Sequence, residues 1–229
     1  MKNVFFYILF ILVTNSTFSQ IHEIGLFIGG CNYVGDIGRT NYIYPENFSG
    51  AFMYKYNYTP RIGFRATYTY LPIKADDANA SNPYRKQQGR SFKNTINEFA
   101  LGMEYNFFEY NISKHSKSFT PYILIEAATF NYKSPVAISS NNTITLQQKY
   151  SYAIPFGLGI KGRLGSSNLA FAFETKVRYT FVDDLDYSTA RFPENPILHF
   201  GGQGNDWYMF TGISLIYTFG RPPCYTDAP

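Results

Sequence analysis

The sequence predicts an all-β protein, an eight-stranded antiparallel transmembrane β-barrel with a filled interior. Three observations predict it. Segments of about 8 to 13 residues alternate between apolar and mixed side chains, which is the period of a strand with a different environment on each face. Aromatic residues are 19% of the chain. Long and short connections alternate between the segments, as they do in outer-membrane barrels.

The last segment, residues 207–219, shows the pattern most clearly. Its bulky residues recur at every second position apart from Thr211, and they are Trp207, Met209, Ile213, Leu215, Tyr217 and Phe219. A tilted membrane strand needs about 9–11 residues, so this segment is long enough to cross a bilayer. Aromatic residues stand at both ends of the bulky face, where membrane–water interfaces favour them. We expect the bulky face to contact lipid and the segment to close the barrel.

Seven further segments carry the same alternation: 23–31, 51–58, 61–70, 95–106, 119–130, 151–163 and 169–179. The long connections are 32–50, 71–94, 131–150 and 180–206, and the shorter ones are 59–60, 107–118 and 164–168. Outer-membrane barrels have short periplasmic turns and long external loops, so we expect four extracellular loops and both termini in the periplasm. The structural alternative is a soluble lipocalin-like barrel, which would bury its apolar face.

The start of the chain has the features of a secretory signal peptide. Lys2 precedes an apolar run at 4–13, and Thr17 and Ser19 occupy the small positions of a cleavage site. The run is too short for a membrane-spanning helix. We therefore expect a signal peptide at 1–19, an outer-membrane barrel at 20–221 and a periplasmic tail at 222–229, in a Gram-negative cell. The mean hydropathy of −0.21 does not argue against a barrel, because outward and inward residues average out.

Charged residues of both signs occupy the predicted inward positions. They are Glu23, Lys55, Arg61, Arg65, Glu98, Glu104, Glu126, Lys161, Glu174, Lys176 and Arg178. Eight strands enclose an interior just wide enough for side chains, and buried charges in it must pair. We expect a lumen charge network that contains Arg65, Glu98, Glu126, Glu174, Lys176 and Arg178. A structural plug explains it better than a solute pore or an acid–base site does.

Nothing in the sequence indicates an enzyme, a cofactor or a metal. His22, His115 and His199 lie outside the predicted strand cores, and none stands beside a serine and an acid on one rim. The acidic residues 183–186 lack the spacing of a calcium loop, which leaves calcium binding there open. The net charge of +4 is spread along the chain, so we expect no nucleic-acid partner and no small-molecule substrate.

The two cysteines do not indicate a disulfide. Cys31 falls near the far end of the first strand, and Cys224 lies beyond the near end of the last. We expect these positions on opposite sides of the membrane, farther apart than a disulfide can span.

Three stretches resemble the PorG-type outer-membrane barrels: residues 23–38 (EIGLFIGGCNYVGDIG), residues 178–186 (RYTFVDDLD), and residues 204–208 together with 217–220. The resemblance implies a role in the type IX protein secretion system, which moves proteins across the outer membrane and supports gliding motility in some bacteria. It also implies binding to the periplasmic ring of PorK and PorN type. The implied role is a scaffold or anchor of that ring.

The periplasmic surface available to such a ring is small. It consists mainly of 107–118 and the tail, whose candidate contacts are Lys114, His115, Lys117, Arg221, Pro222, Pro223, Cys224 and Tyr225. The prolines stiffen the tail and bar it from the sheet, although a disordered end would explain the tail equally well. Two other functions stay open: a surface adhesion barrel acting through its external loops, and a lipid-modifying outer-membrane enzyme.

Overall fold

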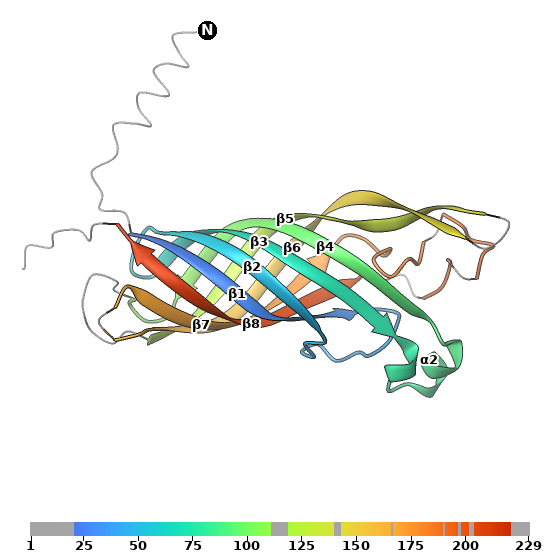
Figure 1. The fold of residues 1–229 in the computed structure, drawn as a ribbon, viewed down its shortest axis with the longest axis horizontal. Helices are drawn as coiled ribbons and strands as arrows, with labels where there is room; N and C mark the ends of the chain where they lie inside the picture. Colours follow the sequence, from blue (N-terminus) through green and yellow to red (C-terminus); the bar gives the residue numbers. More distant parts are fainter. Residues whose placement is uncertain are drawn as a thin grey trace, which may run out of the picture.

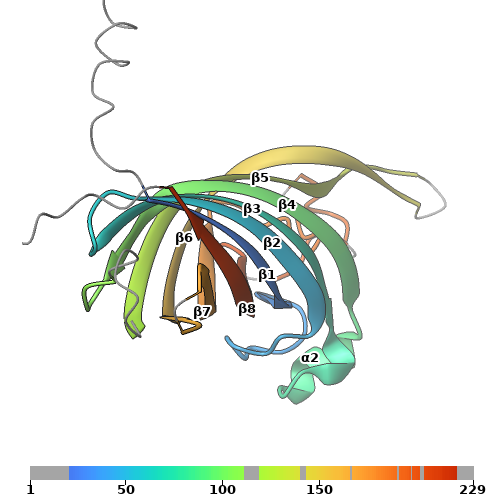
Figure 2. The same cartoon turned by 60° about the vertical axis from the view of Figure 1, so that its left-hand side comes forward.

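Eight strands close into a single barrel in sequence order (Figures 1 and 2). They are β1 (Ile21–Val34), β2 (Asn47–Asn57), β3 (Ile62–Asp76), β4 (Ser91–Asn106), β5 (Phe119–Ile138), β6 (Ile144–Arg163), β7 (Leu169–Thr180) and β8 (Trp207–Phe219). The computed structural model describes residues 21–110, 119–139, 143–165, 167–189, 191–196, 198–201 and 204–220. Among these residues, no helix is long and apolar enough to cross a membrane.

All neighbouring strands are antiparallel, and β8 completes the ring by pairing with both β7 and β1. His22 lies opposite Phe219 at one end of the β1–β8 pair, and Val34 lies opposite Trp207 at the other. The start of β1 and the end of β8 therefore meet at one end of the barrel, which we call the terminal end. The connections that follow β1, β3, β5 and β7 lie at the opposite end, the mouth. The predicted eight-stranded antiparallel barrel is confirmed.

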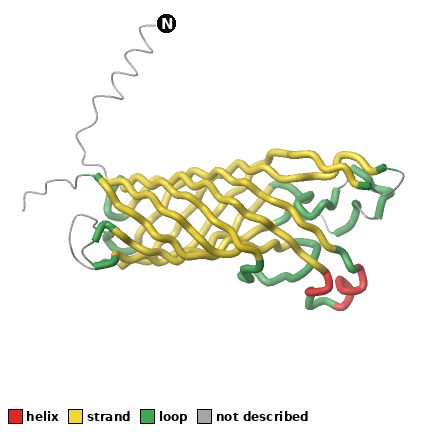
Figure 3. The backbone as a smooth tube through the Cα atoms, viewed as in Figure 1, coloured by secondary structure: helices red, strands yellow, loops and turns green. Residues whose placement is uncertain are grey.

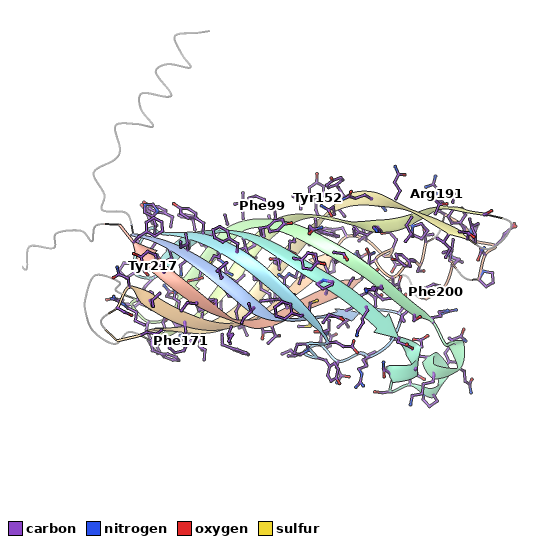
Figure 4. The ribbon with its side chains drawn as sticks, viewed as in Figure 1. Phe99, Tyr152, Phe171, Arg191, Phe200 and Tyr217 are labelled. Carbon is purple, nitrogen blue, oxygen red and sulfur yellow. The ribbon has the colours of Figure 1, made fainter. Side chains whose placement is uncertain are left out.

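Side chains alternate between the outer wall and the interior. In β3, Phe64 and Tyr68 are exposed, whereas Arg65 and Thr67 are buried. The outer wall is apolar over most of its height, and the exposed side chains of Phe99, Phe171 and Tyr217 illustrate it (Figure 4). This is the arrangement of a barrel whose outside contacts hydrocarbon.

The prediction of a polar loop at 131–150 is wrong. β5 and β6 stay paired with each other through most of this region and form a two-stranded hairpin (Figure 3). The pairing of β5 with β4 ends at Asn131, and the pairing of β6 with β7 begins only at Ala153. The Ser139 N–H donates to the Thr143 carbonyl at 3.0 Å and closes the turn. The alternation is hidden here because polar residues stand on both faces of the hairpin beyond the apolar wall.

The connection at 71–94 is also shorter than predicted, because β3 and β4 stay paired to Asp76 and Ser91. It contains the helices η1 (Asp77–Asn79) and α2 (Pro83–Gln88). Asn82 caps α2 by accepting the Tyr84 N–H, Pro83 opens it, and Gly89 ends it with a φ of 62°. These local signals give the connection a defined structure.

Two predictions about individual side chains are wrong, the lipid contact of Met209 and the inward orientation of Arg61. Met209 is only 2% exposed and does not face lipid. Asn32, which lies opposite Met209, donates to the carbonyls of Asn41 and Tyr42 at 3.1 and 3.0 Å, so the connection after β1 folds back over this part of the outer wall. Arg61, which the alternation places in the interior, lies at the terminal end instead. Its guanidinium is 3.6 Å from the Glu109 carboxylate, and its side chain is 46% exposed.

Candidate functional site

Ten charged side chains fill the barrel interior. The cations are Lys55, Arg65, Lys161, Lys176 and Arg178, the anions are Glu23, Glu98, Glu104, Glu126 and Glu174, and none is more than 3% exposed. Their charges balance. Every strand from β1 to β7 contributes at least one of them, because each occupies an inward position of its strand.

The group nearest the terminal end is centred on Glu104. The Lys55 amine lies 2.8 Å from Glu104 and 2.6 Å from Glu23. The Lys161 amine contacts the same Glu104 oxygen, and the ring of Tyr110 lies 4.4 Å from that amine. Two lysines and two carboxylates from four strands thus neutralise each other in this layer.

The central group is built around Arg65. Its guanidinium holds both oxygens of Glu174, at 2.6 and 3.0 Å, in a two-pronged geometry that suits a carboxylate. The same guanidinium lies 3.4 Å from Glu104 and 3.6 Å from Glu126, and so connects the central group to the first one. Lys176 lies 2.8 Å from Glu126 and 3.6 Å from Glu174.

The group nearest the mouth is a single pair. Arg178 donates to Glu98 through Nη2 at 3.0 Å and through Nε at 3.2 Å. The Tyr208 hydroxyl donates to the same carboxylate at 2.7 Å. Within the described part of the chain, Arg178 has no second carboxylate in ion-pair contact. Of the six residues expected in one network, Arg65, Glu126, Glu174 and Lys176 are joined by ion pairs. Arg178 and Glu98 form a separate pair, linked to them only through the Lys176 carbonyl.

Aromatic rings complete the filling of the interior. The Tyr122 hydroxyl donates to Glu174 at 2.7 Å. Its ring occupies the space above Gly159, where a Cβ atom would lie 2.3 Å from the Tyr122 ring. Tyr122 and Tyr208 are not among the residues predicted for the interior network, although both occupy inward positions that the alternation identifies.

The mouth is tied together by a second, acidic cluster. The Tyr33 hydroxyl contacts Asp206 and lies 3.0 Å from Asp186. Asp206 also accepts the Leu185 N–H at 2.9 Å. On the hairpin side, Asp184 accepts from Tyr132 at 2.5 Å, Ser134 at 2.8 Å and Lys149 at 2.7 Å. These contacts fasten the connection after β7 across the mouth.

Burial shifts the titration of this cluster. It is the main cause that raises the pKa of Asp206 to about 8, and the neighbouring Asp186 adds to the shift. Burial also raises the pKa of Asp186 to about 6, and that of Asp183 to about 6 with help from Asp36. The raised pKa values favour the protonated forms of Asp186 and Asp206 beside the Tyr33 hydroxyl.

The structure offers no arrangement for a metal in the described residues, where no group of three or more His, Cys, Asp or Glu side chains could hold an ion. In the stretch 183–186, where the sequence leaves calcium binding open, the Asp184 carboxylate lies 2.7 Å from the Lys149 amine. Cys31 is buried, and its Sγ donates to the Pro72 carbonyl at 3.2 Å. The candidate partner residues lie outside the described residues: Lys114, His115, Lys117, Arg221, Pro222, Pro223, Cys224 and Tyr225.

A closed barrel with an apolar outer wall and a charged, filled interior is a transmembrane barrel of the bacterial outer membrane, because only closure satisfies every backbone hydrogen bond in hydrocarbon. Its outer wall contacts the membrane lipids. The sequence matches a family described as a domain of unknown function, DUF6089, over residues 2–228, and the chain belongs to this family. A comparison with curated proteins gives no match.

Several solved structures of outer-membrane proteins are similar to this chain. A major outer membrane protein from Thermus thermophilus is 17% identical with a TM-score of 0.48, over 88% of this chain and 100% of that one. Ail, the attachment invasion locus protein of Yersinia pestis, is 11% identical with a TM-score of 0.47, over 88% and 99%. The N-terminal β-barrel domain of Pseudomonas aeruginosa OprF is 11% identical with a TM-score of 0.45, over 88% and 98%.

Proposed function

We propose that this barrel is a structural component of the type IX protein secretion machinery and anchors its periplasmic ring to the outer membrane. The observation that carries the proposal is the interior. Ten buried, mutually neutralising charged side chains, packed with tyrosines, suit a rigid membrane anchor and not a route for a secreted protein. The proposed role is therefore neither a channel nor an enzyme.

Parts of the three stretches that resemble PorG-type barrels meet at the mouth, and this supports the proposal. Tyr33 comes from 23–38, Asp186 from 178–186 and Asp206 from 204–208, and the Tyr33 hydroxyl contacts both carboxyl groups. These stretches therefore build a common structural element, the closed mouth.

The proposed orientation places the terminal end in the periplasm, with the signal peptide 1–19 removed. The segment 107–118 begins from a fixed base at this end. The Tyr110 N–H donates to the Pro60 carbonyl at 3.1 Å, and its ring packs over Lys161. Phe107 and Phe108 are exposed beside it. We infer that 107–118 and the tail 220–229 together form the surface that the PorK- and PorN-type ring proteins contact.

Co-purification in mild detergent tests this role. We expect deletion of 222–229, or Lys114→Glu with Lys117→Glu, to leave barrel insertion intact and to reduce both ring recovery and protein secretion. Lys86→Glu with Arg191→Glu is the matched control, since it makes the same charge change at the mouth. If the test variants secrete normally and still recover the ring, this surface is not the contact. If the wild-type barrel recovers no ring proteins, the anchoring role itself fails.

A surface-binding role is the second candidate, and the hairpin formed by 131–152 favours it. The pairing of β6 with β7 begins at Ala153, so residues 144–152 have no β7 partner, and most of their side chains are exposed. Such an edge presents unpaired backbone groups to an added strand. Replacing 133–148 with a short turn separates the two roles. Normal secretion with lost surface attachment would favour binding, and normal attachment would exclude this route.

A further inference from the structure

Three lysines form a cationic surface on the outer wall near the mouth. Lys74 lies directly opposite Lys93 in the β3–β4 pair. The Asn94 side chain accepts the Lys133 N–H at 3.1 Å and donates to the Lys133 carbonyl at 2.8 Å, which fixes Lys133 beside β4. All three side chains are exposed, while their neighbours Ile73, Asn94 and Tyr132 point inward and are buried. We call Lys74, Lys93 and Lys133 the lysine surface.

The three lysine amines have no ion-pair partner among the described residues. Like charges directly opposite each other destabilise a strand pair. Across the described part of the chain, no carboxylate lies within 4.0 Å of the three amines. Glu46 and Asp76 line a cavity together with Lys74 and Lys93, and Asp76 accepts the Ala78 N–H at 2.8 Å. An external anion at this position would remove the repulsion between Lys74 and Lys93.

The lysine surface stands at headgroup height. On the outer wall of β3 and β4, Tyr68 lies opposite Phe99, and in the next outward row Tyr70 lies opposite Asn97. Lys74 follows Tyr70 by four residues, which is about 13 Å along a strand and about 10 Å along the membrane normal at a typical tilt. Aromatic girdles mark the edge of the hydrocarbon. The amines therefore lie among the lipid headgroups.

A cavity of about 520 Å³, lined by both polar and apolar side chains, adjoins the lysine surface. Its lining includes Lys74 and Lys93 together with Glu46, Asp76, Asn79 and Ser91. Amines suit phosphate, whereas carboxylates, amides and hydroxyls suit sugar hydroxyl groups. The cavity lies at the paired ends of β3 and β4, which lead into η1 and α2 (Figure 1).

We propose that the lysine surface and its cavity bind the phosphorylated disaccharide headgroup of lipid A, the glycolipid of the outer leaflet. The choice of leaflet rests on the orientation proposed above, with the mouth outside the cell. Lys74 and Lys93 hold one phosphate between them, and Lys133 widens the positive field. The cavity side chains receive the sugar. The barrel thus has a second attachment to the membrane, at its outer surface.

Binding of purified lipid A to the folded, detergent-solubilised barrel tests the proposal directly. The probes are diphosphoryl lipid A, its monophosphoryl form and phosphatidylglycerol, each titrated by native mass spectrometry. Two lysines near an anionic surface contribute about 1 kcal/mol each, so Lys74→Gln with Lys93→Gln should weaken diphosphoryl lipid A binding about 30-fold. Lys74→Arg with Lys93→Arg should retain binding. Arg61→Gln with Arg163→Gln removes the same charge at the terminal end, away from the cavity, and should have no effect.

Two results would overturn the proposal. One is a glutamine variant that is folded, as shown by its heat-modifiable gel mobility, and binds diphosphoryl lipid A like the wild type. The other is phosphatidylglycerol binding as tightly as lipid A with the same lysine dependence, which would leave only a general attraction to anionic lipid. Neither result depends on ring recovery, so failure here is distinguishable from failure of the anchoring role.

Discussion

Replacing Glu98 by glutamine should strongly destabilise the barrel, although the two side chains have nearly the same size. Glu98→Gln leaves the Arg178 guanidinium buried, without the carboxylate that it contacts at 3.0 and 3.2 Å. Both residues are 0% exposed, so water cannot replace the lost partner. Breaking such a buried pair typically costs about 3–5 kcal/mol. We expect a loss in that range, because the introduced amide can still accept from Tyr208 but carries no charge.

The double variant Glu98→Leu with Arg178→Met provides the control. It removes both charges, and replacing a buried pair by apolar residues is often neutral or stabilising. Urea unfolding from lipid vesicles measures both free energies. Trp207, the only tryptophan in the chain, reports the transition beside Tyr179. A single-variant loss below about 1 kcal/mol, or a double-variant loss equal to the sum of both single losses, would refute the ion-pair reasoning.

Three further predictions concern the wall, the interior and the mouth. Leu158→Arg, on the exposed outer face of β6, should cost about 2–4 kcal/mol near the midplane and reduce the folded fraction on unboiled gels; normal folding would mean that this face does not contact lipid. In planar bilayers the wild-type barrel should show little or no conductance, and a large, stable pore would contradict the filled interior. The third is a pH dependence. Because the pKa of Asp206 is raised to about 8 from 3.8, mouth closure should be most stable at low pH and weaken as pH rises through 8. Protease cleavage within 187–201 should therefore be faster at pH 9 than at pH 6, and Asp206→Asn should remove the difference.

The barrel itself could be predicted from the sequence because lipid and interior impose opposite demands on neighbouring residues. In β7, Phe171 and Phe173 are exposed while Glu174 and Lys176 are buried, and the period of two follows from this. The inward charges could be identified in the same way. Which charge pairs with which could not, since Arg65 and Glu174 are 109 positions apart and their contact depends on the barrel's register.

The signal weakens where the lipid ends. Residues 132–138 and 144–150 form paired strands, yet polar residues on both faces hide the alternation. Met209 follows the outward pattern but is covered, because Asn32 holds the connection after β1 over it. The Tyr33 contacts at the mouth join residues 153 and 173 positions apart. Nothing in the local sequence specifies such ties, although the stretches that contain them were those showing a family resemblance.

The interior and the mouth differ in how they respond to the surroundings, and this difference bears on the anchoring role. The interior ion pairs are fully buried, and salt screens buried pairs much less than exposed ones. The mouth is held by carboxyl groups that titrate between about 6 and 8. A rise in pH should therefore loosen the connection after β7 while the buried ion pairs of the wall stay intact. In the anchoring role proposed above, this separation would keep the ring-contacting surface at the terminal end from moving with the connections at the mouth. The arrangement also explains why a barrel with no route through it would carry so many buried charges: they join seven strands of the wall to one another, independently of the loops at the mouth.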